Sequence, residues 1–274
     1  MDNLKAKKRH PEEIAVYSAI YVCAAFSVLL LLGIIVYVFA KGARRVNWAF
    51  LTGVTSILHG TVGIAGNILN TLIIILLTMI ITTPIGVGAA IYLNEYAKPG
   101  KLVTVIIFAT ETLAGIPSII FGLFGMLFFG QLCHMGYSLL TGSLTLTLMV
   151  LPLVTRNTQE ALKTVPDSFR TGAVGLGAGK WYTIRTILLP SAMPGIVTGV
   201  ILAIGRIIGE SAALLFTAGS AHLLPKTFDA FLEKIFHSGG TLTIQLYLSA
   251  SKGEFEVAFG ICLLYTSPSP RDVE

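Results

Sequence analysis

The chain has 274 residues, of which 54% are hydrophobic and only 12% are charged, and its net charge is +5. Soluble domains carry about twice that share of charged residues, so the composition excludes an ordinary soluble domain and predicts several membrane spans. No basic patch with a groove-reading or aromatic context is present, which argues against a nucleic-acid partner.

The sequence contains no pattern typical of a metal, redox or nucleotide site. Cys23, Cys133 and Cys262 lie in or beside apolar runs without CxxC spacing, and the five histidines are scattered. We therefore expect neither disulfides nor metal ligands. The chain also has no Walker A motif, so any ATP that drives it must be hydrolysed by another chain.

The first apolar run, Ile14–Ala40, follows a basic N-terminal segment. It is longer than the apolar part of a signal peptide, which has about 7–15 residues. We expect residues 1–13 to form a cytoplasmic tail and the run to be an uncleaved first helix.

Further apolar runs follow along the chain. Four are long enough to span a bilayer, at Asn67–Leu93, Leu102–Gly130, Leu139–Thr155 and Pro190–Ala218. A sixth, from about Phe255 to Tyr265, is too short to cross at about 1.5 Å per residue. Small-residue pairs in the fifth run, Gly195 with Gly199 and Gly205 with Gly209, predict close approach of helices.

The distribution of basic residues favours a cytoplasmic N-terminus. With alternating spans, eleven basic residues fall in cytoplasmic segments: Lys5, Lys7, Lys8, Arg9, Lys98, Lys101, Arg156, Lys163, Arg170, Lys180 and Arg185. Six fall outside: Lys41, Arg44, Arg45, Lys226, Lys234 and Lys252. The group from Lys41 to Arg45 is a local exception.

Three ionisable residues interrupt the spans: Glu111, Arg206 and Glu210. A charge at the centre of a membrane helix costs about 2.5–3.5 kcal/mol, so such residues tend to face a polar path or the bundle interior. Arg206 and Glu210 are four residues apart, so they could pair on one helical face, either on a transport path or as a structural ion pair. An arginine fork suits tetrahedral oxyanions. Arg156 is a second candidate, or else an interfacial anchor.

A polar segment between the fourth and fifth spans carries Gly177, then nine residues, then Ile187-Leu188-Leu189-Pro190. This spacing resembles the cytoplasmic EAA loop of ABC-importer permeases. The Glu-Ala-Ala positions of that loop are Thr171, Gly172 and Ala173 here. A glycine in place of alanine weakens a short helix by about 1 kcal/mol.

Longer segments resemble one family more narrowly, the phosphate-specific permeases of the Pst importer, and favour their A-type subunit. The matching segments are Ala90–Ala97, Leu113–Phe124, Arg156–Leu162 and Gly205–Ala218, and the similarity runs from about Asn67 to Ile261. The resemblance implies an all-α integral membrane fold, the six-helix permease of a type I ABC importer. The permease domain would cover residues 14–262, with a coupling loop at about 159–189.

The resemblance also implies roles and partners. Arg156 and Arg206 would line or gate the phosphate path, with Glu210 as their neighbour. The segment Thr171–Trp181 would supply a short coupling helix, in which Gly175, Gly177 and Gly179 allow a tight turn and Lys180 and Trp181 provide contacts. The implied partners are a second, C-type permease, a dimer of ATP-binding subunits that holds ATP and Mg²⁺, and an extracytoplasmic phosphate-binding protein. The chain itself would bind no cofactor and catalyse no reaction, in a bacterial or archaeal cell membrane.

The end of the chain departs from the family, whose sixth helix continues apolar. We expect residues 263–274, which contain Pro268 and Pro270, to be non-native sequence. Three alternatives remain for the function: a permease for another oxyanion or small polar solute, an ion-coupled secondary transporter, and a membrane scaffold that signals phosphate status. The secondary transporter is disfavoured because no paired inverted repeats with broken helices are visible.

Overall fold

The structure, a computed structural model, describes residues 11–56, 61–98, 100–225 and 227–265. Most of the expected N-terminal tail, and residues 266–274 of the expected non-native tail, lie outside the described residues. The helical fold expected from the sequence is confirmed, with one addition: a short antiparallel hairpin of β1 (Val54–Ser56) and β2 (Thr61–Ile64).

The described helices follow one another with short connections. In chain order they are α1 (Pro11–Gly42), α2 (Trp48–Thr52), α3 (Ala65–Ile91), α4 (Lys101–Gly115), α5 (Ser118–Gly125), α6 (Leu139–Thr164), α7 (Asp167–Gly175), α8 (Lys180–Thr183), α9 (Leu189–Ile208), α10 (Ala212–Thr217), α11 (Phe228–Lys234), α12 (Leu242–Ser251) and α13 (Phe255–Tyr265). Three π-helical segments extend this framework, at Tyr92–Tyr96 after α3, Met126–Leu132 after α5 and Ile184–Leu188 before α9.

Four helical stretches of the described chain are long and apolar enough to cross a membrane. They are Ala15–Gly42, Ala65–Tyr96, Leu139–Thr164 and Lys180–Ile208, and a fifth is obtained if the bent pair of α4 and α5 counts as one span. The short sixth run is helical, as α13. The fourth span is longer than the sequence indicated, because α6 continues through Thr164 into the expected coupling loop.

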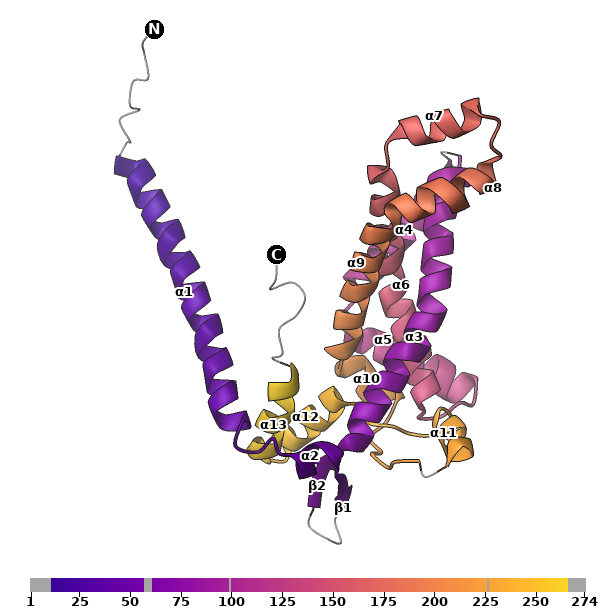
Figure 1. The fold of residues 1–274 in the computed structure, drawn as a ribbon. Coiled ribbons are helices and arrows are strands. Elements are labelled where there is room, and N and C mark those ends of the chain that lie inside the picture. The colour runs from indigo at the N-terminus through magenta and orange to yellow at the C-terminus, as the bar shows by residue number, and fades with distance from the viewer. Residues whose placement is uncertain (1–10, 57–60, 99, 226, 266–274) are drawn as a thin grey trace.

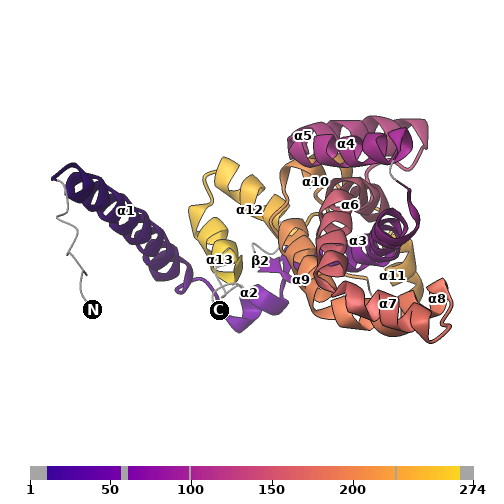
Figure 2. The same ribbon diagram turned by 90° about the horizontal axis from the view of Figure 1, so that it is seen from above.

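The core lies where α3, α6 and α9 pack together, with α6 at the centre of the bundle (Figure 2). Leu146 and Val150 of α6 are fully buried there, beside Ile74 of α3 and Ala203 of α9. The expected close approach of α9 is confirmed at Gly195, where an added Cβ would lie 2.6 Å from the Ala161 Cβ. At Gly205, by contrast, no other atom lies within 4 Å of that position.

The first helix stands apart from the bundle (Figure 1). Most of the described side chains of α1 are exposed, and the helix approaches the rest of the chain at its C-terminal end, beside α13. Helix α7, which overlaps the segment expected to form the coupling helix, lies at one end of the molecule and the β hairpin at the other (Figure 1).

The span expected at Leu102–Gly130 is not one straight helix. The chain bends by 102° between Gly115 and Ser118, so α4 and the stretch from α5 onward form a broken pair. Pro117 explains the break, because it lacks an N–H and disfavours the helical conformation in the residue before it. Ile116 accordingly adopts an extended conformation, with φ −75° and ψ 132°.

The span expected at Pro190–Ala218 is found with other bounds, as the helical stretch Lys180–Ile208. Helix α9 ends at Ile208, and α10 begins at Ala212. Glu210 lies in the break, where its Oε1 accepts a hydrogen bond of 3.0 Å from the backbone N–H of Ala213. The carboxylate thus stabilises the first turn of a new helix instead of extending the old one.

Candidate coupling and transport site

Arg170 attaches helix α7 to the bundle. Arg170 Nη2 donates to Glu95 Oε1 at 2.9 Å, and Arg170 Nε donates to the same oxygen at 3.3 Å. The same guanidinium donates to the backbone carbonyls of Leu162 and Val165, each at 3.0 Å, near the end of α6. It also contacts Asp167 Oδ1 at 3.0 Å. Arg170 therefore joins α7 to the ends of both α3 and α6.

The Arg170–Glu95 pair is mostly withdrawn from solvent. The side chains are 23% and 9% exposed, respectively. The hydrogen bond to the Glu95 carboxylate raises the pKa of Arg170, so the guanidinium remains charged. Charge-assisted hydrogen bonds of this kind are stronger than neutral ones. This connection was missed in the sequence, although Glu95 lies at the end of an apolar run in one of the segments that resemble the Pst family.

A second contact links the coupling loop to the end of α3. The ammonium of Lys180 lies 4.8 Å from the centre of the Tyr96 ring, a cation–π distance. Lys180 was predicted to contact a partner, and its exposed position leaves that prediction open. In this structure the residue also helps to fix the loop.

The tight turn predicted between α7 and α8 is confirmed. Gly177 has φ +80°, a left-handed conformation that glycine adopts without steric cost. Its N–H donates to the Val174 carbonyl at 2.9 Å, and the Ala178 N–H donates to the Ala173 carbonyl at the same distance. No other atom lies within 4 Å of an added Cβ at Gly177, so the backbone conformation and not the available space requires glycine there.

Residues 187–190, which end the spaced motif that begins at Gly177, lie at the base of the loop. Leu188 is buried with Ile184 against Leu162 and Val165 of the α6 end, and Leu189 packs beside them. Pro190 follows directly on the π-helical segment Ile184–Leu188, so its missing N–H falls where the π-helical hydrogen-bond pattern gives way to the α-helical one. Ile187 is half-buried. This cluster packs the segment before α9 against the end of α6.

Large apolar side chains around the turn are left uncovered. Leu176 is 92% exposed and Trp181 is 62% exposed, and Phe169, Val174 and Tyr182 are exposed beside them in the sequence. We call these five residues the coupling surface. They belong to an element that projects from one end of the molecule (Figure 1). Exposed apolar patches of this kind mark surfaces that contact another protein or a membrane.

Thr171 and Gly172 do not prevent the coupling helix from forming. Both are exposed residues of α7, and the Thr171 hydroxyl donates to the Asp167 carbonyl at 3.2 Å. Asp167 itself lies in the first turn, where a negative charge is favourable. The helix begins four residues before the segment Thr171–Trp181 that was expected to supply it.

The predicted helical pairing of Arg206 with Glu210 is wrong. Arg206 is exposed on α9, whereas Glu210 lies beyond the end of that helix and caps α10. The ion pairs found in the described part of the chain are Arg156–Glu160, Arg170–Glu95 and Arg170–Asp167. The guanidinium of Arg206 therefore forms no ion pair within the described part of the chain.

Arg156 and Arg206 lie at two different depths of the bundle. Gly195 lies against Ala161, and Gly199 lies against Asn157, so α9 runs antiparallel to α6. At about 1.5 Å per helical residue, Arg206 is displaced from Arg156 by roughly 9 Å along the bundle axis. The two arginines are thus on neighbouring helices but not side by side.

A small cavity of about 170 Å³ lies beside Arg156, between α4 and α6. The charged residues that line it are Glu111, Arg156, Glu160 and Lys163. Arg156 Nε is 3.3 Å from Glu160 Oε1, and both side chains are more than half exposed. Exposed pairs of this type contribute about 0–1 kcal/mol, so the guanidinium is free to exchange partners.

The fold and the site together define a membrane permease whose coupling element projects from an apolar bundle. Residues 82–249 match the family described as "Binding-protein-dependent transport system inner membrane component". The chain belongs to this family of membrane transport components, whose members are not enzymes. Membership also implies, in general, an ATP-hydrolysing partner and a solute-binding partner.

Curated relatives extend the similarity over most of the chain. The Probable ABC transporter permease protein YqgI of Bacillus subtilis is 37% identical over 237 residues, which cover 84% of this chain and 81% of that protein. The Phosphate transport system permease protein PstA of Xylella fastidiosa (strain Temecula1) is 38% identical over 181 residues, 65% of this chain and 62% of the relative. The protein of the same name from Yersinia pestis is 41% identical over 157 residues, which cover 57% of this chain and 52% of the relative.

A solved structure supports the fold. The chain is similar to one from the MetNI methionine ABC transporter in an inward-facing conformation, with a TM-score of 0.55 and 21% identity, over 74% of this chain and 86% of that one. At this identity the likeness concerns the architecture. It agrees with the all-α permease fold expected from the sequence.

Proposed function

We propose that the chain is the A-type permease subunit of an ATP-driven phosphate importer and forms half of the phosphate path. The observation that carries the proposal is the presence of two uncovered arginines, Arg156 and Arg206, on neighbouring helices of an apolar bundle. The names of relatives at 38% and 41% identity, which are phosphate transport permeases, support phosphate as the solute.

The two arginines suit a tetrahedral dianion or monoanion. A guanidinium offers several donors in a planar fork and stays charged throughout the accessible pH range. Their axial separation of roughly 9 Å would let an anion leave one arginine as it reaches the other. Glu210 has a different task from the one expected: it fixes the break after α9 and thereby positions the helix end that carries Arg206.

The coupling surface is the proposed contact with the ATP-binding subunits. A permease without a nucleotide site must receive force through a projecting element, and α7 is such an element. Its attachment to α3 and α6 through Arg170 would transmit a displacement of α7 to the helices that carry the core. ATP and Mg²⁺ would be bound by the dimer of ATPase subunits and not by this chain.

The remaining partners lie on the other surfaces. A second, C-type permease would complete the path and cover the face of α9 that exposes Arg206. A phosphate-binding protein would deliver the solute at the end opposite α7. This arrangement requires a cytoplasmic N-terminus in a bacterial or archaeal inner membrane, in agreement with the distribution of basic residues.

The test is phosphate uptake by the complete importer with Arg206→Gln in this subunit. We expect uptake to fall by about tenfold or more, as for the loss of a charge-assisted hydrogen bond, while assembly with the ATPase persists. Lys252→Gln, which removes an exposed charge from the end of α12, serves as the control. Unchanged uptake in the arginine variant would remove Arg206 from the path. If unlabelled sulfate inhibits the uptake of labelled phosphate as strongly as unlabelled phosphate does, the chain belongs instead to a permease for oxyanions in general.

A further inference from the structure

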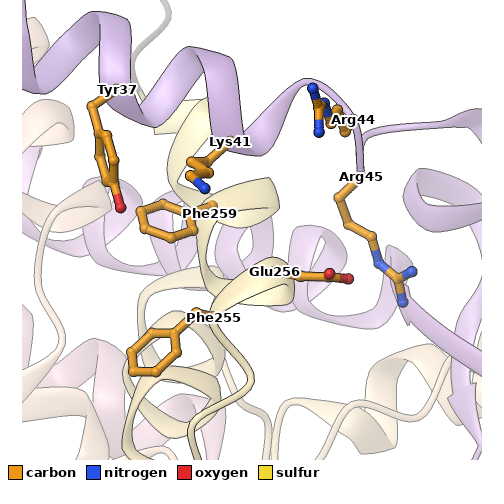
Figure 3. A pocket seen from close by; sticks show the side chains of 7 residues that line it. All are labelled: Tyr37, Lys41, Arg44, Arg45, Phe255, Glu256 and Phe259. Atoms are coloured by element: carbon orange, nitrogen blue, oxygen red, sulfur yellow. The ribbon is translucent and has the colours of Figure 1, made fainter.

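A second cationic site lies far from the coupling helix, where the end of α1 meets α13. A cavity of about 620 Å³ opens there between the two helices (Figure 3). It is lined by three basic residues, three aromatic residues and one acid: Lys41, Arg44, Arg45, Tyr37, Phe255, Phe259 and Glu256. We call it the α1–α13 cavity.

Close packing holds the walls of this cavity in place. An added Cβ at Gly42 would lie 2.5 Å from the Phe259 carbonyl oxygen, so glycine lets the two helices touch. Tyr37 and Phe259 pack edge to face with ring centres 5.5 Å apart. The stem of Arg45 passes close to Gly260, where its Cγ would be 3.4 Å from an added Cβ. The cavity is therefore a built feature of the α1–α13 contact.

The polar side of the cavity carries an excess of positive charge and an unsatisfied donor. Arg45 Nε is buried and has no hydrogen-bond partner among the described residues. Figure 3 shows the Glu256 carboxylate on the side of Arg45, yet the ion pairs in the described ranges involve neither residue. Buried donors normally have an acceptor. The site thus offers donors and cations suited to an anion.

The other side of the cavity is aromatic. Phe255 is more than half exposed, and Tyr37 is also exposed at the end of the first span. Aromatic side chains at span ends lie at the boundary between lipid tails and headgroups. A free phosphate ion would use only the cations, whereas a phospholipid would use both sides.

We propose that the α1–α13 cavity binds the phosphate headgroup of an anionic phospholipid. Arg44, Arg45 and Lys41 contact the phosphate oxygens, and the aromatic residues contact the glycerol and the upper acyl chain. Arginine forks bind phosphate oxygens in pairs, and basic pockets between membrane helices bind anionic headgroups. The bound lipid fastens α1, which is otherwise largely exposed, to α13. Lys41, Arg44 and Arg45 are an exception to the preference of basic residues for the cytoplasmic side, and a bound anionic lipid would account for them.

The test is native mass spectrometry of the full chain in its assembled importer, titrated separately with phosphatidylglycerol, phosphatidylcholine and inorganic phosphate. We expect phosphatidylglycerol to bind more tightly than phosphatidylcholine. Arg44→Gln, at an exposed position that is not part of the packing, should weaken phosphatidylglycerol binding by about tenfold. Arg45→Gln should weaken it at least as much. Lys252→Gln removes a charge at the same end of the molecule but outside the cavity, and should change the affinity by less than about twofold.

Three results would overturn the proposal. Equal binding of the two lipids would show that the headgroup charge is not recognised. Equal losses in Arg44→Gln and Lys252→Gln would show that only general surface charge acts. Displacement of phosphatidylglycerol by inorganic phosphate at matched concentrations would assign the cavity to the free ion. Phe255→Ala distinguishes a lipid from a free phosphate ion further, because it should weaken the binding of phosphatidylglycerol and leave the binding of inorganic phosphate unchanged.

Discussion

Arg170 and Glu95 lie 75 positions apart in the sequence, yet Arg170 Nη2 is 2.9 Å from Glu95 Oε1. The contact joins the coupling helix α7 to the π-helical end of the span that begins with α3. The guanidinium also donates to two carbonyls near the end of α6. Arg170 therefore connects α7 to the ends of two helices of the core.

Replacing Arg170 should uncouple ATP hydrolysis from transport. Arg170→Met leaves the Asn94 amide, at 2.7 Å, as the remaining side-chain donor to Glu95 Oε1 and removes the arginine donor from the Leu162 and Val165 carbonyls, at a cost of about 1–3 kcal/mol in the free energy of unfolding. We expect a lower melting temperature and ATP hydrolysis that continues without matching uptake. Both are measured in the reconstituted importer.

The control for this experiment is Arg185→Met, at an exposed position of the same loop. It should leave both the melting temperature and the ratio of ATP hydrolysed to phosphate transported unchanged. If the two variants behave alike, the Arg170–Glu95 contact does not carry the coupling.

Gly177→Ala should destabilise the turn between α7 and α8. Gly177 has φ +80°, and a residue with a Cβ in this left-handed conformation lowers the free energy of unfolding by about 1–2 kcal/mol. Gly175→Ala is the matched control, because Gly175 is exposed, has no other atom near its Cβ position and ends a helix without a positive φ. Hydrogen exchange of the α7 and α8 amides should accelerate in the first variant only. Equal exchange in the two variants would refute the role of the left-handed turn.

Gly172→Ala should strengthen the coupling helix. The position is helical and exposed, and an added Cβ would meet no other atom within 4 Å. Alanine is favoured over glycine within a helix by about 0.5–1 kcal/mol. Slower hydrogen exchange in α7 is the expected result. Faster exchange would mean that this segment is not a helix in the assembled protein.

Glu210 and Arg206 should be energetically independent in folding. Glu210→Ala removes the acceptor for the Ala213 N–H and should cost about 1 kcal/mol, as for the loss of a helix cap. Glu210→Gln keeps an acceptor oxygen and should cost less. A double-mutant cycle with Arg206→Gln, followed by thermal unfolding, should give a coupling energy near zero. A coupling of 1 kcal/mol or more would restore the ion pair expected from the spacing of the two residues.

Local patterns were sufficient to predict most of the helices. Apolar runs long enough for a bilayer have few stable alternatives to a helix, because each backbone polar group needs an internal partner. The long first helix, the short last one and the glycine turn at Gly177 were therefore predictable. The break at Pro117 was not, because proline is tolerated inside α3, α6 and α9 and the sequence does not say which proline will bend the chain. The break at Glu210 was not predictable either, because the hydrogen bond from the Ala213 N–H to the Glu210 carboxylate is seen only in the structure.

The candidate site was only partly predictable for the same reason. Gly177, Leu189 and Pro190 follow a spacing within one segment, so the sequence predicted a coupling loop there and the turn at Gly177. The contact that attaches the loop, Arg170 with Glu95, joins segments far apart, and no local periodicity encodes it. Arg206 and Glu210 are four residues apart, which indicated a pair only under the assumption that the helix continues.

The sequence by itself determined that this protein is a helical membrane permease and predicted where its coupling loop lies, because hydrophobic length and motif spacing are local properties. Only the tertiary structure decided how that loop is attached, where Glu210 points, and that Lys41, Arg44 and Arg45 share a cavity with the aromatic side chains of α13. Each of these depends on contacts between distant segments, and such contacts are fixed by the packing of the whole chain.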